Sequence, residues 1–431
     1  MIRRYKTEIW LFSLGFGIRL AYAIAVQFFF GSHGFAANSD AESFIAVANN
    51  LLAHGVFSPM TESPFIPDPL RTPPYPFFLA LFLYFKTPLF WIAAFQNFLA
   101  GITGVLIYRT GKIIFKSAAV GVIAAALFIL EPVSIYWNNL LMSDNLFSFL
   151  FFLAFYLFVV RKFYLSALIL GLAALTRPIG FYFAPLFLAA SAVLYYRGDY
   201  KGDSFTWKKA LIAVLLFFMV LAPWAARNKI LFNTWELSSV GWVNLYFFTF
   251  SRFAATEGID LPTPEAPEGY SGDAATIFTY DFANVPFYKS TAQKLILERP
   301  WEYLKFHLAY FLKTFNYHGY DYLIEQVVRT KFPNIGEKLS SFAVRAGQGA
   351  WWLIYALGLI GLFRKEHRAW SIFILSFAAL NNFLLIASGV SQGGRYGLPV
   401  MPMLLLLGSY GAVSVYRAIQ NFYLERRIIK V

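Results

Sequence analysis

The chain of 431 residues is 58% hydrophobic and only 14% charged, with a formal net charge of +13 at pH 7. Soluble domains carry about 25% charged residues, so this composition excludes an ordinary soluble domain and indicates a polytopic membrane protein. The absence of cysteine excludes disulfides, zinc–thiolate sites and a thiol nucleophile. Basic residues that flank membrane spans explain the positive charge better than nucleic-acid binding does.

Apolar segments recur along the whole chain and predict an all-α protein with about ten transmembrane helices. Their approximate limits are 8–31, 89–109, 118–132, 145–160, 163–177, 179–196, 210–226, 349–363, 369–388 and 396–416. Several are shorter than the roughly 20 residues that a span needs, so their ends are placed only to within a few residues. The first is too long for a signal peptide and no small-residue cleavage site follows it, so we expect an uncleaved span.

The distribution of charge predicts the orientation of these spans. Lysine and arginine cluster in six short segments, at 3–6, 109–116, 161–162, 197–209, 364–368 and 417–430. The loop 32–88 instead carries four acids, which are Asp40, Glu42, Glu62 and Asp68, against Arg71 and Lys86. The positive-inside rule therefore predicts that both termini are cytoplasmic and that the acidic loop lies outside.

Three parts follow from this layout. Residues 1–226 form a transmembrane core with seven spans and the outer loop 32–88, and residues 349–431 form three C-terminal transmembrane helices. Between them, 227–348 is too polar to cross the membrane. Within it, residues 288–316 have apolar and aromatic side chains at helical spacing with lysines interleaved, which predicts juxtamembrane helices lying on the membrane surface.

Asp40 is the first residue with a pattern that suggests chemistry. It follows Ser39, an expected N-cap, and a helical apolar pattern begins at Phe44, so Asp40 lies in the first turn of an outer helix. A carboxylate at the membrane edge can accept a proton from a hydroxyl, but aspartate is also common in first turns as a cap. Glu42 lies two residues on and points to a different face, as a supporting or solvated residue.

Arg71 precedes two prolines in the same loop, within Arg71-Thr72-Pro73-Pro74. A fixed arginine at the membrane edge can bind phosphate bidentately. The alternative is an ordinary interfacial arginine that pairs with lipid headgroups.

Several other charges lie in or beside the spans. Arg19 is near the middle of the first span, where an arginine costs about 2.5–3.5 kcal/mol, so it must face protein or water. Five charged residues map to the outer side and predict one polar site that could hold a phosphate or pyrophosphate: Asp40, Arg71, Asp144, Arg177 and Arg395.

An ordered set of short motifs resembles the GT-C glycosyltransferases of the protein-mannosyltransferase and aminoarabinose-transferase type, which use polyprenyl-phosphate sugars. The matching pieces are 40–44 with Ala48, Leu51 and Gly55; 70–80; Glu131-Pro132 with Ser143-Asp144-Asn145; 171–178; Pro223-Trp224 with Arg227-Asn228; and 395–399 with Pro402. Each piece is weak alone, and no motif matches within 229–348.

This resemblance implies a GT-C fold and a role for each matched residue. Asp40 takes the place of the base that activates the acceptor, and Arg71 that of the residue that contacts the donor phosphate. Asp144, with Glu131 as the alternative, takes the place of a second acid near the site. The remaining candidate substrate-binding residues are Glu42, Arg177, Arg395 and Tyr396.

One departure narrows the expected acceptor. The family's protein mannosyltransferases carry adjacent Asp-Glu, whereas Ala41 separates Asp40 and Glu42 here. This favours a bacterial-type enzyme of the inner (plasma) membrane that acts on a glycan or lipid over a protein O-mannosyltransferase.

The expected activity is therefore an inverting glycosyltransferase that moves a sugar from a polyprenyl-phosphate donor to a glycan, lipid or, less favoured, protein hydroxyl on the outer face. The five histidines are scattered without metal-ligand spacing, so no cofactor is expected, although a divalent cation stays open. The rival readings are a membrane transporter or lipid flippase, a scaffold with a degenerate site, and a glycan ligase or polymerase that uses a lipid pyrophosphate.

Overall fold

The computed structural model describes residues 5–196, 206–264, 281–314, 333–388 and 393–428, and these contain helices but no strand. The all-helical prediction is therefore confirmed over the described residues. The first half of the chain forms α1 (Lys6–Phe30), η2 (Gly31–Phe35), α2 (Ser39–His54), α3 (Pro74–Tyr84), α4 (Leu89–Ile114), α5 (Ala118–Leu130), α6 (Pro132–Asn138), α7 (Ser143–Val159), α8 (Phe163–Thr176), η3 (Pro178–Phe183), α9 (Ala184–Tyr196) and α10 (Trp207–Phe232).

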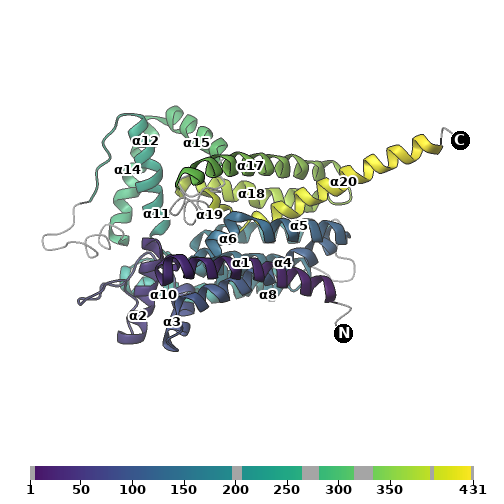
Figure 1. Cartoon of the computed structure of the whole chain (residues 1–431). Coiled ribbons are helices and arrows are strands. Elements are labelled where there is room, and N and C mark those ends of the chain that lie inside the picture. Colours follow the sequence, from purple (N-terminus) through teal and green to yellow (C-terminus); the bar gives the residue numbers. More distant parts are fainter. Residues whose placement is uncertain (1–4, 197–205, 265–280, 315–332, 389–392, 429–431) are drawn as a thin grey trace.

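The second half begins with short elements that lie away from both termini (Figure 1), here called the outer elements, and it ends with three long helices. The outer elements are α11 (Val240–Asn244), the π-helix η4 (Leu245–Phe250), α12 (Ser251–Thr256), η5 (Phe282–Asn284), α14 (Val285–Glu298) and α15 (Pro300–Thr314). They are followed by α17 (Pro333–Ile360), η7 (Gly361–Phe363), α18 (Arg368–Ser388), α19 (Gly393–Gly397) and α20 (Met401–Ile428).

Five helical segments among the described residues are long and apolar enough to cross a membrane. They are Lys6–Phe35, Leu89–Ile114, Trp207–Phe232, Lys338–Phe363 and Met401–Tyr423. The pair α5 and α6, bent by 57°, would make a sixth, and four further apolar helices are shorter. The chain is thus a helical membrane protein. Each of the ten predicted segments coincides with a helix, but the number that cross the membrane stays a prediction.

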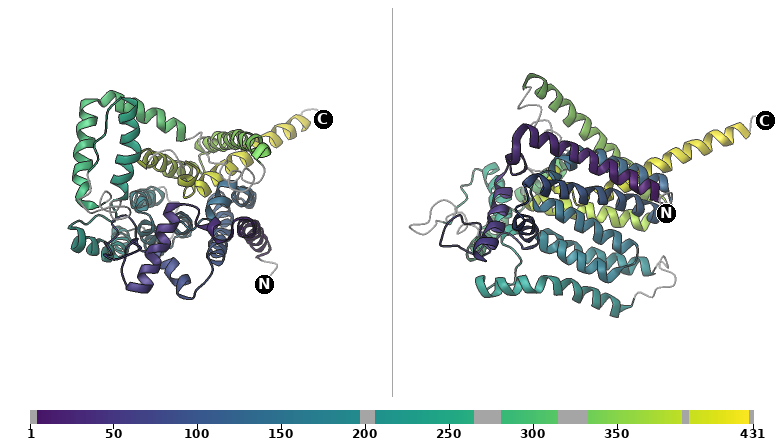
Figure 2. Two further views of the ribbon diagram at one scale, coloured as in Figure 1. Left: turned by 60° about the vertical axis from the view of Figure 1, so that its left-hand side comes forward. Right: turned by 60° about the horizontal axis from the view of Figure 1, so that its bottom comes forward.

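The long helices lie side by side in one bundle (Figures 1 and 2). α1 packs on α4, α4 on α5 and α7 on α8, and α20 returns to pack on both α5 and α17. Close approach depends on glycine: a Cβ at Gly121 would collide with the carbonyl oxygen of Tyr108, and one at Gly411 with that of Leu357. This packing brings the C-terminal helices against the N-terminal core.

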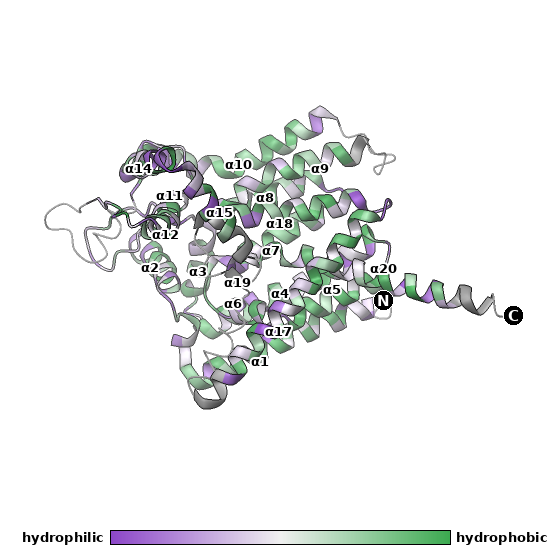
Figure 3. Cartoon of the chain, turned by 90° about the horizontal axis from the view of Figure 1, so that it is seen from above, coloured by the Kyte–Doolittle hydropathy of each residue, from purple (hydrophilic) through white to green (hydrophobic). Residues whose placement is uncertain are grey.

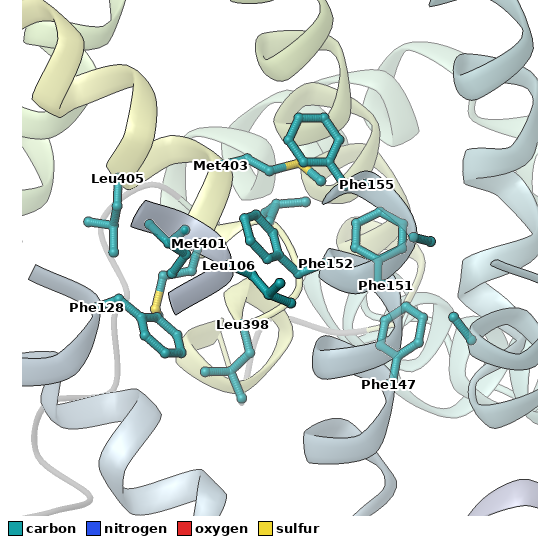
Figure 4. Packing of buried hydrophobic residues seen from close by; sticks show 14 of the residues in the cluster. Leu106, Phe128, Phe147, Phe151, Phe152, Phe155, Leu398, Met401, Met403 and Leu405 are labelled. Carbon is teal, nitrogen blue, oxygen red and sulfur yellow. The ribbon is translucent and has the colours of Figure 1, made fainter. Parts of the chain in front are cut away.

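Phenylalanine side chains of α7 fill the centre of the bundle. Figure 4 shows Phe147, Phe151 and Phe155 on successive turns of this helix, with Phe152 next to Phe151, and with Met401, Met403 and Leu405 of α20 nearby. Phe151 and Phe183 both contact the ring of Phe377, at 5.7 and 5.6 Å between centroids. The same helix α7 carries Asp144 in its first turn, so the core fixes the position of that carboxylate.

Several helix boundaries differ from the predicted ones, including the end of α4 at Ile114 instead of 109 and that of α20 at Ile428 instead of 416. α10 continues to Phe232 instead of ending at 226, because Asn233 adopts the left-handed conformation that ends the helix only there. α17 begins at Pro333, before the expected 349. The last span was expected from 396, but the short α19 comes first and α20 begins at Met401.

The outer elements pack around a second, smaller core. Phe250, Phe253, Leu295 and Phe306 meet there, between η4, α12, α14 and α15. In Figure 3 the bundle helices are mostly hydrophobic, whereas hydrophilic residues are more frequent in α14. The predicted outer helices at 288–316 are present as α14 and α15, except that 315 and 316 lie outside the described residues. Their position on the membrane surface stays a prediction.

The basic segments gather at the end of the bundle that carries both termini (Figure 1). Arg109 pairs with Glu8 at 3.6 Å, which joins the end of α4 to the start of α1. Phe115 stacks on Tyr410 at 4.4 Å and also contacts His367, which joins that end to α18 and α20. The segments 197–205, 1–4 and 429–431 lie outside the described residues.

The bent pair α5–α6 stops short inside the bundle. α5 has 13 residues and is about 20 Å long, against a hydrocarbon core of about 30 Å. Its last carbonyl groups accept from the fully buried Arg19, at 3.0 Å from Phe128 and 3.1 Å from Ile129, and Arg19 also donates to Ser134 at 2.8 Å. Arg19 therefore faces protein, as predicted, and donates hydrogen bonds to carbonyl oxygens at the end of α5.

Amide side chains satisfy the irregular backbone that follows this break. Gln96 donates to the carbonyl oxygens of Asn138 and Leu140, and Asn145 donates to those of Trp137 and Leu140, all at 2.9–3.1 Å. Non-helical backbone at membrane depth is tolerated only where protein supplies such partners. This network leads directly into α7 and sets the start of the helix that carries Asp144.

Candidate active site

Helix α2 presents Asp40 without using it as a cap. The Oδ1 atom of Asn38 accepts the backbone N–H of Ala41 at 2.8 Å, so Asn38 is the N-cap. The prediction that Ser39 caps the helix was wrong, because Ser39 is already its first residue. Since Asn38 makes the capping bond, the side chain of Asp40 is available for another role.

Two carboxylates and two arginines meet beside this first turn. Arg395 donates from Nη2 to Asp40 at 3.0 Å, and from Nε and Nη2 to Asp144 at 3.0 and 2.9 Å. Arg177 pairs with the other oxygen of Asp144. These contacts join four parts of the chain that are distant in sequence: the start of α2, the start of α7, the α8–η3 junction and the short α19. Four of the five predicted charges lie in one cluster.

The two carboxylates of this cluster differ in exposure. The Asp144 side chain is 4% exposed and contacts both arginines, whereas that of Asp40 is 47% exposed and pairs with Arg395. A buried carboxylate between two guanidinium groups is typical of a structural ion pair. The half-exposed Asp40 can be reached by a second molecule.

Aromatic rings hold the guanidinium groups in place. Arg395 lies over the rings of Trp137 and Tyr396, each 5.5 Å from the ring centroid, and Arg177 lies 5.5 Å from the same Tyr396. Tyr396, predicted as a substrate-binding residue, therefore contacts both arginines of the cluster.

Arg71 lies at the edge of the cluster and pairs with a different acid. Its Nη1 is 3.3 Å from the buried Asp68, and its guanidinium lies 5.6 Å from the ring centroid of Phe44, one turn after Asp40 on α2. The neighbouring Thr72 donates to the carbonyl oxygen of Thr176 at 3.1 Å, directly before Arg177. Arg71 is thus connected to the cluster through adjacent residues on both sides.

Asp68 and Arg227 organise the loop that carries Arg71, and sequence reasoning assigned neither this role. Asp68 accepts the backbone N–H groups of Leu70 and Arg71 at 2.7 and 3.1 Å, an Asx turn. Arg227 donates to its carbonyl oxygen at 3.2 Å and lies 4.4 Å from the ring of Trp224. The Asp-Pro-Leu-Arg spacing before the prolines was a turn signal that could have indicated the first contact.

The other candidate acids lie apart from these contacts. Glu42 is exposed, and no ion pair between described residues includes it. Glu131, the alternative to Asp144, accepts the N–H of Ser134 at 2.8 Å as the N-cap of α6, in the break that Arg19 serves. Asp144 is accordingly the second acid of the cluster.

The site offers few ligands for a metal ion. Among the described residues no three His, Asp or Glu side chains converge. The carboxylate oxygens of the cluster that could bind a metal ion belong to Asp40 and Asp144, and Arg395 pairs with both.

An apolar groove lies next to the α8–η3 junction. It has a volume of about 170 Å³ and runs between α8, α9 and α10. Its lining runs from Phe181 and Pro185, which follow Arg177 within eight residues, to Phe163 and Lys209, which adjoin two of the basic segments. Apolar chain-like molecules fit such a groove.

Comparison with known proteins gives no further guide to the site: no protein-family model matches the chain, and no curated protein is significantly similar to it.

Proposed function

We propose that the chain is a GT-C-type inverting glycosyltransferase that moves a sugar from a polyprenyl phosphate to a hydroxyl of a glycan or lipid on the outer face of the membrane. The observation that carries this proposal is the half-exposed carboxylate of Asp40, which is oriented by Arg395 beside a buried Asp144–Arg177 pair. An acceptor can reach the Asp40 carboxylate there. The neighbouring arginines are cations that suit a departing phosphate.

In this reaction the acceptor oxygen attacks the anomeric carbon as Asp40 takes the hydroxyl proton, which requires hydrogen-bond reach. A new C–O bond forms on one face, and the bond from the anomeric carbon to the phosphate oxygen breaks on the other. The electron pair leaves with the phosphate, whose growing charge the nearby arginines stabilise. One carboxylate suffices, because a phosphate leaves without a general acid.

Two features support a lipid phosphate donor. Arg71, Arg177 and Arg395 are planar cations at one end of the bundle, and guanidinium groups bind phosphate oxygens bidentately. The groove between α8, α9 and α10 could take part of an isoprenoid chain, because its lining is almost entirely apolar. Asp68 restrains the Arg71 guanidinium through the ion pair at 3.3 Å.

The test is incubation of the purified protein with a panel of polyprenyl-phosphate sugars and measurement of released polyprenyl phosphate. Asp40→Asn should lower the rate by about 10²–10⁴, while Glu62→Gln, on an exposed part of the same loop, should retain it. Arg71→Ala should raise the donor KM. Full activity of the Asp40 variant would overturn the assignment of the base, and absence of transfer with every donor would overturn the function.

A lipid flippase or transporter is the second candidate, and the broken pair α5–α6 favours it, since such proteins use discontinuous helices at membrane depth. Against it, the break is occupied by Arg19, whose Nη1 and Nη2 groups donate to carbonyl oxygens and Ser134. Movement of a fluorescent polyprenyl phosphate across liposomes that contain the protein, without any sugar transfer, would favour this candidate.

A further inference from the structure

The contacts of Arg395 indicate how the proposed donor and Asp40 share one cation. Arg395 is 7% exposed and is held from two directions: its Nε and Nη2 contact the buried Asp144, and the rings of Trp137 and Tyr396 lie against it. These contacts keep the guanidinium in place whether or not Asp40 contacts it.

Asp40 is the replaceable partner of this arginine. Its side chain is 47% exposed, so water can solvate the carboxylate once the 3.0 Å contact with Arg395 is broken. Helix α2 does not depend on that contact either, because Asn38 makes the capping bond at 2.8 Å. An anion that arrives from the outer side can therefore replace Asp40 at Arg395, while the buried contact of Arg395 with Asp144 is kept.

We propose that the phosphate of the donor binds at Arg395 by displacing Asp40, so that donor binding releases the base for the acceptor. The identity of the anion as a lipid phosphate monoester rests on the proposed function, but the exchange itself requires no turnover. It predicts negative coupling: the Asp40 carboxylate and a phosphate compete for the Nη2 group of one arginine, and donor binding precedes the step in which Asp40 accepts a proton.

Binding measurements on the full chain in detergent test this exchange. The probes are farnesyl monophosphate, which carries a prenyl chain, and inorganic phosphate, which does not; binding of the first alone shows that the chain contributes. Asp40→Asn should bind farnesyl monophosphate about threefold to tenfold more tightly than the unsubstituted protein, because a half-exposed ion pair is modest in strength and phosphate no longer meets a like charge.

The matched control is Glu62→Gln, which removes the same charge from an exposed position of the outer loop and should leave the affinity unchanged. In an Arg395→Met background the Asp40→Asn change should no longer tighten binding, since the shared cation is gone. If Asp40→Asn and Glu62→Gln tightened binding of farnesyl monophosphate equally, the change in affinity would reflect net charge alone and would overturn the exchange.

Unchanged, weaker or undetectable binding in Asp40→Asn would also overturn it. These outcomes are separate from the outcome for the proposed function: tighter phosphate binding without sugar transfer from any donor would leave the exchange standing and remove the transferase.

Discussion

Asp40 and Asp144 both pair with Arg395, but they differ in how deeply their carboxylates are buried. Asp144 is buried, pairs with two arginines and starts a helix of the core, whereas Asp40 is half exposed on an outer helix. Removing one partner of a buried ion pair leaves an uncompensated charge and costs about 3–5 kcal/mol. We therefore expect Asp144 to contribute stability and position, and we propose Asp40 as the residue for chemistry.

Arg19 is the clearest case for a stability measurement at the residue scale. Arg19→Met should lower the free energy of unfolding by about 2–5 kcal/mol, because carbonyl oxygens at the end of α5 lose their donors inside the membrane. The measurement is the thermal unfolding midpoint in detergent.

Two further variants sharpen this test. Arg19→Lys should fall between wild type and Arg19→Met, since an ammonium can serve fewer of these oxygens. Ile24→Met, on the exposed side of the same helix, is the matched control and should change little. An unchanged or raised midpoint for Arg19→Met would show that the break is stable without its cation.

The sequence indicated most of the clustered residues but not their partners. Asp40, Asp144, Arg177 and Arg395 could be assigned to one side because charge next to an apolar span is rare and its side follows from the loops. The pairing of Arg71 with Asp68 could not be foreseen, because an arginine beside a phosphate site and one in an Asx turn have the same local sequence. The cap was misplaced by one residue, since Asn38 and Ser39 are equally suitable caps.

At the element scale, the helix break and the amide network place the site. α5 ends early at Glu131-Pro132, where proline removes a donor and Glu131 caps the next helix. Hydropathy indicated an end near 132 but could not show that the chain continues there as the bent helix α6. Gln96 and Asn145 were uninformative in sequence for the same reason: an amide in a span has no assigned partner until the irregular backbone is located.

The outer helices α14 and α15 should be sensitive to pH through His307. Burial lowers the pKa of His307 from its ordinary value of 6.5, and its ring lies 4.2 Å from that of Tyr303. The unfolded segment therefore binds a proton more readily than the folded one. The stability contributed by neutral His307 is fully present above pH 6.5 and is lost as the pH falls towards the lower pKa of the folded segment.

Hydrogen–deuterium exchange of α14 and α15, corrected for intrinsic rates, is the measurement for this prediction. Protection should fall in the unsubstituted protein as the pH is lowered from about 6.5 to about 5. His307→Phe, which fills similar space and cannot titrate, should remove the pH dependence. If protection in the two proteins changed equally with pH, another group would be responsible.

At the scale of the whole molecule, the sequence predicted helices and their order well because each apolar run also has charged or proline-rich limits. It could not predict how far helices continue into polar sequence. In the part of α10 past 226, Arg227 stacks on Trp224 and Asn228 donates to the carbonyl oxygens of Glu236 and Leu237. Hydropathy does not detect such polar contacts.

The number of membrane crossings depends on the short apolar helices, and α7 is the most informative of them. Its 17 residues are about 26 Å long, close to the thickness of the hydrocarbon core. Near its end, Phe158 contacts Trp370, three residues after the basic segment around His367. If α7 crosses, Arg161 lies on the same side as Lys365 and opposite to Glu62.

Because the chain has no cysteine, single cysteines can be placed without background labelling. Glu62→Cys should react with a membrane-impermeant maleimide in right-side-out vesicles, whereas Lys365→Cys and Arg161→Cys should react only after permeabilisation. All three positions are exposed, so accessibility reports the side of the membrane and not burial. Labelling of Arg161→Cys from outside would reduce the number of crossings, and labelling of Lys365→Cys from outside would invert the predicted orientation and with it the side on which Asp40 works.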